Sequence, residues 1–433
     1  MKFKIANQLK VDTTEYPTLS IVICILLLLM SMFVTPYLCY VAVLICVYRI
    51  IRYDAKVFAT DYCLMIPWSQ LFRTTGGMAL LIWLCLFAAI WHFVKGKIQG
   101  NGTLICVILL LNYLVARMQM NINVFVLCFG QIFLLYVLLP KQDERSALRT
   151  IRVFCWSLLV SSVCALVLRN TSQLAVVRGP EPAAYWGSTL KRFQGMFTDP
   201  NYYMTLLIVG IVLQVKLKMC DQISMARFLV VATVFSLLGI LTYSKTFLLV
   251  FAVLVVLCIV WQFWNKKYVT ACALTVVVTI VGAWLLLSPN SLISVVMYRL
   301  MSANTISELT TGRTDIYAEY WAATMENMST AFWGVGLNAP MLRMDPHNMY
   351  LEAMYKTGIV GLVLLAAFFV SMARIVQRRA AETQNWMSKN IVLIIVFVVY
   401  FSLHGLTSMF SYASFFLAFL AIMLTKGKKG ADW

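Results

Sequence analysis

Charged residues are scarce in this sequence. They make up 12% of its 433 residues, whereas hydrophobic residues make up 62%, and soluble globular proteins have about 25% charged residues. Soluble, disordered, collagen-like and coiled-coil classes are therefore excluded, because long apolar runs with so little charge need lipid around them. The mean hydropathy of +0.84 indicates an integral membrane protein.

The sequence also lacks the marks of a secreted, disulfide-bonded protein. None of its 12 cysteines lies in the two long connections between apolar runs, 169–199 and 289–346, so no disulfide framework is expected. The first apolar run is followed by Thr35-Pro36-Tyr37 instead of a small-residue cleavage site. We therefore expect this run to stay as a membrane anchor and not to be removed as a signal peptide.

Apolar runs follow one another along the chain, and thirteen of them are strong. They cover 18–34, 36–51, 78–94, 103–118, 122–140, 151–168, 200–217, 226–242, 245–264, 268–288, 349–373, 390–405 and 409–425. A weaker run at 57–73 contains Asp61 and Pro67, so hydropathy alone leaves it open between a spanning helix and a re-entrant segment. We expect an all-α polytopic protein, a single membrane domain over 1–433 with about 14 (12–14) transmembrane helices.

The distribution of positive charge indicates whether the weak run at 57–73 spans the membrane. If 57–73 spans, every second connection and both tails lie on one face, which holds 24 of the 35 Lys and Arg residues and eight of the 17 Asp and Glu residues. The positive-inside rule then predicts fourteen spans with both termini cytoplasmic. The net charge of +18 is thus a matter of topology, and the expected partner is a lipid bilayer, not a nucleic acid.

The two long connections, 169–199 and 289–346, both face outward in this topology. The second carries Ile316, Tyr320 and Ala323 at helical spacing. This spacing predicts short amphipathic helices lying over the membrane helices.

The two connections end in similar sequences. Asp199-Pro200-Asn201 closes the first, and Asp345-Pro346-His347-Asn348 closes the second. In each, Asp is predicted to cap a membrane helix that begins at Pro, which would place His347 in the first helical turn. Such helix starts attract anions, although ordinary capping would leave the same sequence.

Between them lies Thr311-Gly312-Arg313-Thr314-Asp315. Thr314 is predicted to cap a short helix with Arg313 just outside it, an arrangement that suits a phosphate because a guanidinium binds two oxygens while backbone amides bind others.

Five short patterns in this half of the chain occur together. They are R-F-x-G-x-F-x-D-P-N at 192–201, G-R-T-D-I-Y at 312–317, G-V-G at 334–336, H-N-M-Y-L-E at 347–352 and G-I-V-G-L at 358–362. In this order they resemble the O-antigen ligase and O-antigen polymerase superfamily of bacterial envelopes. The resemblance covers roughly residues 190 to 365, and residues 1 to 190 add only hydropathy.

The resemblance implies a GT-C-like enzyme of the bacterial cytoplasmic (inner) membrane. Such an enzyme transfers a glycan from undecaprenyl diphosphate to an acceptor hydroxyl on the outer face, without a nucleotide sugar, a metal or another cofactor. By motif, Arg192 and Arg313 would hold the diphosphate and His347 would serve the reacting hydroxyl. Lys245 stands where the family often has arginine, and it is a weaker candidate because an ammonium lacks the two-pronged geometry.

Three further residues are secondary candidates. Arg299 and Arg343 would reach diphosphate or sugar, unless they only extend along the membrane interface. His404 lies in a short outer turn near the expected site, whereas His92 is expected to be structural. Neither outer connection contains a D-x-D or E-x-D pair, which disfavours a metal.

We expect a polymerase, which joins carrier-linked repeat units, over a ligase, which passes the finished chain to a lipid core or another acceptor. This preference rests on fourteen spans and a compact outer connection. A polysaccharide flippase is the alternative from another class. It is disfavoured because the spans hold few charges beyond Asp61, Glu352 and Lys356. A flippase and a chain-length regulator are the protein partners expected for such an enzyme.

Overall fold

A computed structural model describes most of the chain. The described residues are 18–72, 80–96, 107, 109–110, 113–115, 122–184, 189–264, 266–287, 295, 298, 301, 305–310, 312–337, 339–340, 342, 344–380 and 408–424. They form helices joined by loops, with an isolated antiparallel bridge between Ala183 and Lys191. The predicted all-helical class is confirmed.

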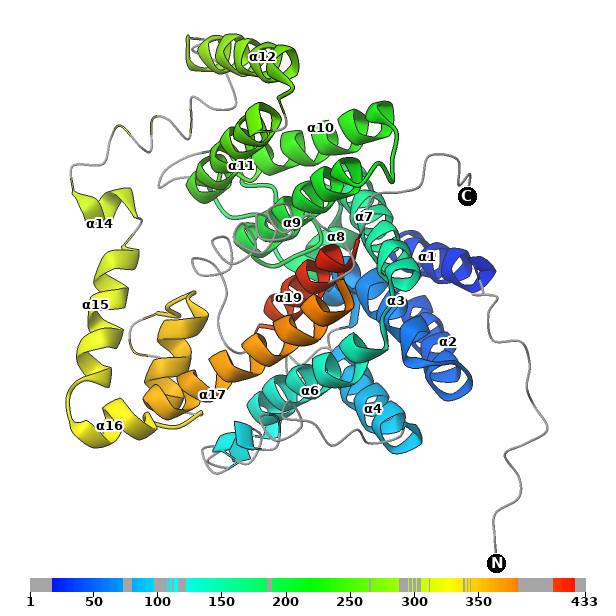
Figure 1. The fold of residues 1–433 in the computed structure, drawn as a ribbon, viewed down its shortest axis with the longest axis vertical. Coiled ribbons are helices and arrows are strands. Elements are labelled where there is room, and N and C mark those ends of the chain that lie inside the picture. Colours follow the sequence, from blue (N-terminus) through cyan, green and yellow to red (C-terminus); the bar gives the residue numbers. More distant parts are fainter. Residues whose placement is uncertain are drawn as a thin grey trace, which may run out of the picture.

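The helices follow the predicted apolar runs (Figure 1). In the first half they are α1 (Thr18–Phe33), α2 (Leu38–Arg52), α3 (Ala55–Met65), η1 (Ile66–Phe72), α4 (Leu80–Lys95), α6 (Ile122–Leu138), η2 (Leu139–Lys141), α7 (Glu144–Val167) and α8 (Ser172–Arg178). In the second half they are α9 (Pro200–Met219), α10 (Met225–Leu241), α11 (Lys245–Trp264), α12 (Tyr268–Leu287), α14 (Ile306–Leu309), α15 (Arg313–Thr324), α16 (Met328–Trp333), α17 (Met349–Ala380) and α19 (Met409–Met423). The runs at 103–118 and 390–405 lie largely and wholly outside the described residues, respectively.

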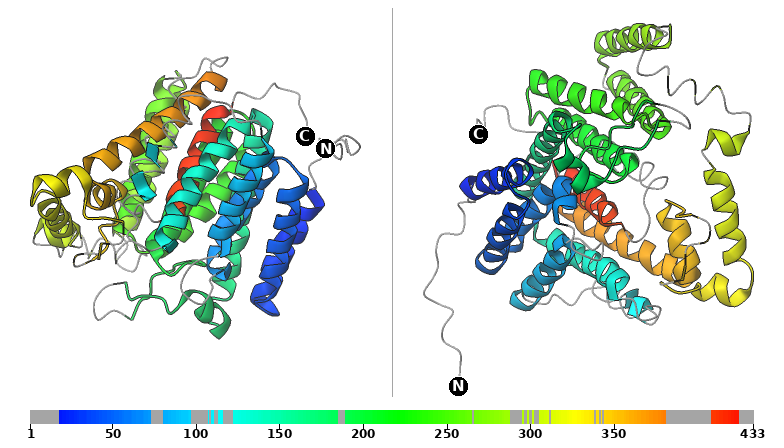
Figure 2. Two further views of the ribbon diagram at one scale, coloured as in Figure 1. Left: turned by 90° about the horizontal axis from the view of Figure 1, so that it is seen from below. Right: turned by 180° about the vertical axis from the view of Figure 1, so that it is seen from behind.

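Length and composition mark several of these helices as membrane helices. Among the described residues, four are long and apolar enough to cross a bilayer: Glu144–Val167, Pro200–Met219, Lys245–Trp264 and Met349–Arg378. Shorter apolar helices are Leu19–Phe33, Leu80–Lys95, Val126–Lys141, Met225–Leu241 and Met409–Met423. Neighbouring helices stand side by side in the left view of Figure 2.

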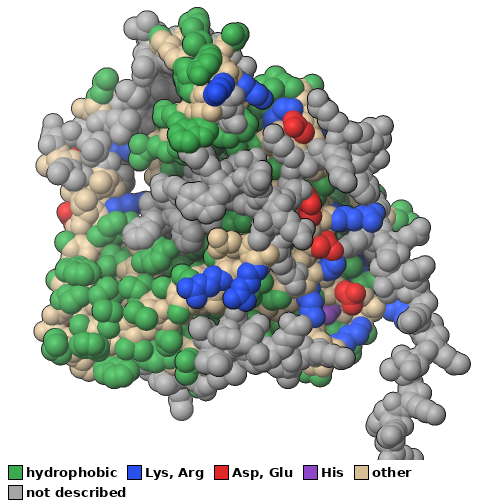
Figure 3. Space-filling view, viewed as in Figure 1, with side chains coloured by type: hydrophobic (Ala, Val, Ile, Leu, Met, Phe, Trp, Pro, Cys, Tyr) green, Lys and Arg blue, Asp and Glu red, His purple; other side chains and the backbone are tan. Residues whose placement is uncertain are grey.

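One end of the bundle gathers three basic connections, 49–56, 141–152 and 216–227, and we call it the basic end. Four side-chain contacts tie it together: Arg49 with Ser20, Lys95 with Ile51, Lys56 with Asp143, and Arg152 with Gln222. Figure 3 views the molecule from this side, and Lys and Arg side chains are spread across the face. These connections were predicted from charge to share one face, and the contacts show that they share one end.

The opposite end gathers the long connections. There Arg192 joins the Thr242 carbonyl to Asn201, and Tyr202 contacts both His347 and Phe410. The starts of α9, α11, α17 and α19 therefore meet at this end. Whether it faces out of the cell stays a prediction.

The weak run at 57–73 passes from one end to the other. Lys56 lies at the basic end beside Asp143, and the Leu71 carbonyl at the other end accepts from Cys39 Sγ. Between these points Trp68 Nε1 donates to Ser157 Oγ. Eleven residues of α-helix and seven of 3₁₀-helix extend about 30 Å, because the 3₁₀ form rises more per residue.

The core of the bundle is mainly apolar, with some polar and charged side chains buried in it. Every residue of α19 is buried, and this helix packs against α17, α7, α9 and α6. A helix that is apolar on all sides is covered either by other helices or by lipid, and α19 is covered by its neighbours. By contrast Leu249, Val256 and Trp264 on α11 are well exposed, which suits a face turned to lipid.

Candidate functional site

The first long connection is fixed by a buried arginine. Arg178, only 3% exposed, donates from Nη1 to the Gly195 carbonyl at 3.1 Å and forms an ion pair with Glu181 at 2.8 Å. Glu181 also pairs with Arg169 at 3.0 Å. A buried guanidinium is costly unless it is paired and hydrogen bonded, so these contacts hold the loop against the helix ends.

This loop presents Arg192 at the opposite end. Its Nε donates to the Thr242 carbonyl at 2.8 Å, and its Nη2 donates to Asn201 Oδ1 at 3.1 Å. Thr242 ends α10 and Asn201 belongs to the first turn of α9. The guanidinium plane is therefore fixed between two helix ends, and the side chain is half-buried.

The predicted start of α9 is confirmed. Asp199 caps the helix by accepting from Asn201 N at 2.6 Å, and Pro200 is the first helical residue. Gly195, four residues earlier, has a φ of +57°, and a Cβ there would run into the ring of Tyr203. The glycine of R-F-x-G is thus required by both backbone conformation and space.

The predicted start of α17 is wrong. The helix begins at Met349, and Asn348 caps it by accepting from Tyr350 N and Leu351 N, both at 3.1 Å. Asp345 instead accepts from His347 N at 2.8 Å, which turns the chain before the helix. His347 therefore precedes the cap and does not lie in the first turn.

His347 has an uncommon backbone conformation. Its φ of +45° lies in the left-handed region, which costs a residue with a side chain roughly 1–2 kcal/mol. The imidazole lies edge-on to the Tyr202 ring, with the ring centroids 6.5 Å apart. Tyr202 follows Asn201, the partner of Arg192, so His347 and Arg192 are linked through two consecutive residues of α9.

Tyr202 was not predicted, and it lies at the centre of this group. Its ring packs against Phe410 of α19 at 5.5 Å as well as against His347. The carboxylates of Asp199, Asp345 and Glu352 all lie within electrostatic reach of its hydroxyl. Nothing in the sequence marked it except its position directly after the D-P-N pattern.

The prediction for Arg313 also needs correction. Arg313 is the first residue of α15, and Gly312, with a φ of +78°, is the cap residue. Thr314 was predicted to cap, but it lies inside the helix with its hydroxyl 3.2 Å from that of Thr310. The glycine allows the left-handed turn that sets the helix start two residues earlier than Thr314 as N-cap would.

Lys245 connects the membrane helices to the second long connection. It is the first residue of α11, and its Nζ donates to the Glu308 carbonyl of α14 at 3.3 Å. Its neighbour Ser244 caps α11 by accepting from Phe247 N at 3.4 Å. Lys245 and Arg313 therefore flank the same short segment, α14.

A short helix, α15, lies where the spacing in the second connection predicted one. Its residues Ile316 and Tyr320 are buried against Tyr355 of α17. The Tyr320 hydroxyl donates to the Met344 carbonyl at 3.0 Å, and burial raises the pKa of Tyr320 to about 12. The protonated phenol thus fastens α15 to the segment that leads into His347.

The G-V-G segment closes a break in α17. Gly358 interrupts that helix with a φ of +66°, and Figure 1 shows the two parts of α17 at an angle. Val335 N donates to the Tyr355 carbonyl and Gly336 N to the Lys356 carbonyl, both at 2.9 Å. The loop thereby satisfies carbonyls that the break would otherwise leave without partners.

A buried ion pair lies just beyond the cap of α17. Lys356 Nζ contacts Glu352 Oε1, and the two side chains are 6% and 1% exposed. The sequence marked both residues as rare charges inside a span, and their spacing of four residues is that of a helical pair. Their pairing was not predicted.

Of the remaining candidate residues, some lie outside the described residues and one is buried elsewhere. Arg299, Arg343 and His404 lie outside the described residues, so their roles stay predictions. His92 is 6% exposed inside α4, away from the residues above. Across the part of the chain that is described, no three His, Cys, Asp or Glu side chains are grouped as metal ligands, and metal use itself is untested.

Together these features define a class of protein, a helical membrane protein with arginine, lysine and histidine gathered where helices and two long loops meet at one end. Residues 228–366 match the family model Wzy_C, described as O-Antigen ligase. The chain is similar to this family over about a third of its length, and the match confirms the resemblance to the O-antigen ligase and polymerase superfamily. Members of the family are glycosyltransferase-like enzymes that act on lipid-linked glycans.

The match contains Lys245, Arg313, the G-V-G segment and His347, whereas Arg192 precedes it. No curated protein matches the chain, and no solved structure matches it either.

Proposed function

We propose that this protein is a polysaccharide polymerase that transfers a glycan from undecaprenyl diphosphate to a sugar hydroxyl at the outer face of the bacterial inner membrane. The observation that carries the proposal is the link from Arg192 through Asn201 and Tyr202 to His347. It brings a fixed guanidinium and an imidazole to one end of a membrane bundle, in a chain similar to enzymes that act on lipid-linked glycans.

The proposed reaction needs a proton acceptor and a site for a leaving diphosphate. His347 accepts the proton of the acceptor hydroxyl, and that oxygen bonds to the anomeric carbon of the carrier-linked sugar. The bond from this carbon to the diphosphate oxygen breaks, and the electron pair leaves with the carrier diphosphate. Arg192, Arg313 and Lys245 stabilise the negative charge that develops there.

Fixed positions make these cations effective. Arg192 is fixed by Thr242 and Asn201 before any ligand arrives, so little reorganisation is needed as charge develops. Lys245 and Arg313 flank α14 and would approach a diphosphate from the side of the second loop.

The preference for a polymerase over a ligase rests on the number of apolar runs and on the compact second connection, whose described residues include α14, α15 and α16. A ligase would use the same groups on a different acceptor. A flippase would need polar groups along a path through the bilayer, and the cations described here gather at one end.

Reconstituted protein separates the three functions. Vesicles containing the purified chain and a lipid-linked repeat unit as both donor and acceptor should yield carrier-linked products of two or more repeats. A ligase would form a glycosidic bond only after addition of a different acceptor lipid, and a flippase would form none. The same assay with EDTA tests the expected independence of metal, and vesicles without the protein serve as the inactive control.

A further inference from the structure

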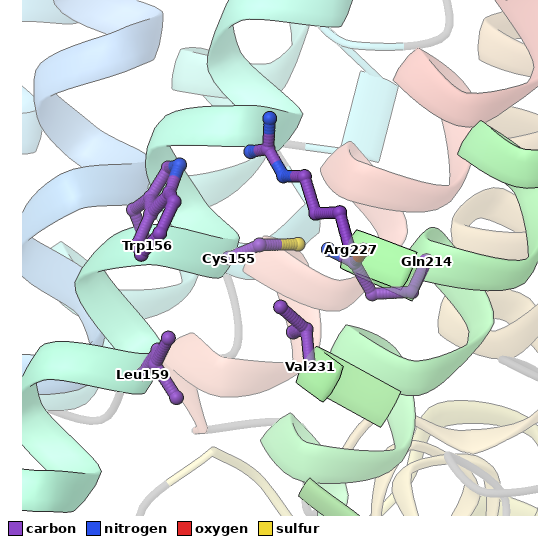
Figure 4. A pocket seen from close by; sticks show the side chains of 6 residues that line it. All are labelled: Cys155, Trp156, Leu159, Gln214, Arg227 and Val231. Carbon is purple, nitrogen blue, oxygen red and sulfur yellow. The ribbon is translucent and has the colours of Figure 1, made fainter. Parts of the chain in front are cut away.

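A second basic site lies at the basic end, far from the groups described above. A narrow crevice, whose space of about 160 Å³ includes open solvent, lies between α7, α9 and α10 (Figure 4). Its lining residues are Cys155, Trp156, Leu159, Gln214, Arg227 and Val231. The guanidinium of Arg227 lies over the Trp156 ring, 5.3 Å from its centroid.

Polar atoms of the crevice lack partners. Gln214 is 1% exposed, and its Oε1 has no hydrogen-bond partner within the described structure. The same holds for the buried Nε of Arg227 and for Nε of Arg152, one turn before Trp156. Buried polar groups normally have partners, so these atoms point to a ligand.

The charge at this crevice is also unbalanced. Arg152 and Arg227 lie close enough to repel each other. The described ion pairs at this end join Arg49 to Asp61, Lys56 to Asp143 and Lys218 to Asp221, and none of them includes Arg152 or Arg227. Two neighbouring guanidinium groups without a carboxylate form a site for an anion, and phosphate oxygens fit this geometry.

The surroundings indicate that the anion carries acyl chains. Trp156 lines the crevice and is 46% exposed, and Met225, Leu229 and Val230, on the same helix as Arg227, are between 52% and 63% exposed, as expected of a surface in contact with lipid tails. Basic pockets between membrane helices on the cytoplasmic side bind anionic headgroups. The charge distribution predicts that this end faces the cytoplasm.

We propose that the crevice between α7, α9 and α10 binds an anionic glycerophospholipid, with its phosphate held by Arg227 and Arg152. Gln214 Oε1 accepts a hydrogen bond from a hydroxyl of the headgroup. A headgroup of the phosphatidylglycerol type supplies both the net negative charge and the hydroxyl. A zwitterionic headgroup leaves the two guanidinium groups without a counter-charge.

Thermal unfolding of the full-length, delipidated protein in neutral detergent tests the proposal. A ligand that binds only the folded state raises the unfolding midpoint. Phosphatidylglycerol should raise it, whereas phosphatidylethanolamine and inorganic phosphate at the same concentration should not. Arg227→Gln should weaken phosphatidylglycerol binding about tenfold to a hundredfold, since one charge-assisted contact is lost. Lys218→Gln, a change to a partly exposed cation at the same end, should keep the full shift.

Three results would overturn the assignment. Equal stabilisation by phosphatidylethanolamine would mean that the site does not distinguish an anionic from a zwitterionic headgroup. Equal stabilisation by inorganic phosphate would mean that a free anion occupies the crevice. If phosphatidylglycerol raises the unfolding midpoint of Arg227→Gln as much as that of the unaltered protein, Arg227 does not belong to the binding site. If that variant does not fold, native mass spectrometry of the unaltered protein still decides, because bound phosphatidylglycerol should survive competition with excess phosphatidylethanolamine.

Discussion

The two long connections end in nearly the same residues and enter their helices differently. After Asp199-Pro200 the helix begins at once, with the aspartate as its cap. After Asp345-Pro346 the chain makes a further turn through His347, and Asn348 becomes the cap. At the first exit the helix starts directly after the aspartate, whereas at the second a left-handed residue, His347, precedes the cap and holds its imidazole outside the helix.

The difference teaches where chemistry is placed. A conformation that costs free energy persists only when its surroundings enforce it, and such residues cluster at functional sites. At the second exit, the Asp345 side chain and the packing of Tyr202 enforce it. At the first exit the proposed functional group is Arg192, which lies before the cap and is fixed by hydrogen bonds from its guanidinium.

The largest effect is expected at His347. Removal of a general base slows a reaction about 10²–10⁴-fold, so His347→Ala should cause carrier-linked single repeats to accumulate at the expense of polymer. His347→Asn provides the control for the backbone, because asparagine tolerates a left-handed φ. If both variants lose polymer formation equally at normal protein levels, the effect comes from the loss of the imidazole. Normal polymer in His347→Asn would show that only the turn matters, and His404 would be the next candidate.

Arg192 should come second. Arg192→Ala should slow transfer about 10²–10³-fold, as for loss of one fixed donor to developing charge, and Arg192→Lys should restore part of the rate. The measurement is the initial rate in reconstituted vesicles, together with the unfolding midpoint. Because Arg192 also joins α9 to the end of α10, a lower midpoint with a normal rate per folded molecule would indicate a purely structural role.

The break in α17 should be intolerant of side chains. Gly358 and Gly179 have similar backbone angles, φ +66° and ψ −173° against φ +77° and ψ +176°, so alanine adds similar strain to both. A Cβ at Gly358 would meet the Phe332 carbonyl, whereas Gly179 has nothing within 4 Å. Gly358→Ala should therefore destabilise the protein by about 2–5 kcal/mol, and Gly179→Ala by clearly less. Equal shifts in unfolding midpoint would show that the contact with Phe332 is unimportant.

The smallest effects are expected for the helix caps, and they should distinguish Asp199 from Asp345. Asp199→Ala and Asn348→Ala each remove a helix cap and should cost about 1 kcal/mol. Asp345→Ala removes no cap, so the unfolding midpoint should change less, but transfer should slow because His347 loses the contact that turns it. If Asp345→Ala lowers stability as much as Asp199→Ala without slowing transfer, the two exits are equivalent after all.

The sequence predicted elements better than their ends. Apolar runs depend on composition over many residues, so the helices and the shared end of the basic connections were within reach. The start of α17 depended on whether Asp345 or Asn348 caps the helix, and the start of α15 on whether Gly312 or Thr314 does. Both starts also depended on backbone angles, at His347 and Gly312, that composition does not specify. A D-P pair predicts a helix start only if the next residues stay helical.

The charged residues of the candidate site were predicted from motifs, whereas the contacts between them were not. Arg192, Arg313 and His347 were recognised from their motifs. Tyr202 was not, since its role comes from the approach of α9, α17 and α19, which are far apart in sequence. The pairing of Glu352 with Lys356 required the fold as well, although their spacing was visible.

The ion pair between Arg49 and Asp61, 3.1 Å long and almost completely buried, bears on how the protein is made. α3 carries an aspartate and is followed by Pro67, so it is a poor candidate to enter the bilayer alone from the insertion machinery. Its partner Arg49 lies at the end of α2, the helix synthesised just before it. We therefore expect α2 and α3 to partition into lipid together as a hairpin, because Arg49 neutralises the charge of Asp61 and so lowers the free-energy cost of inserting α3.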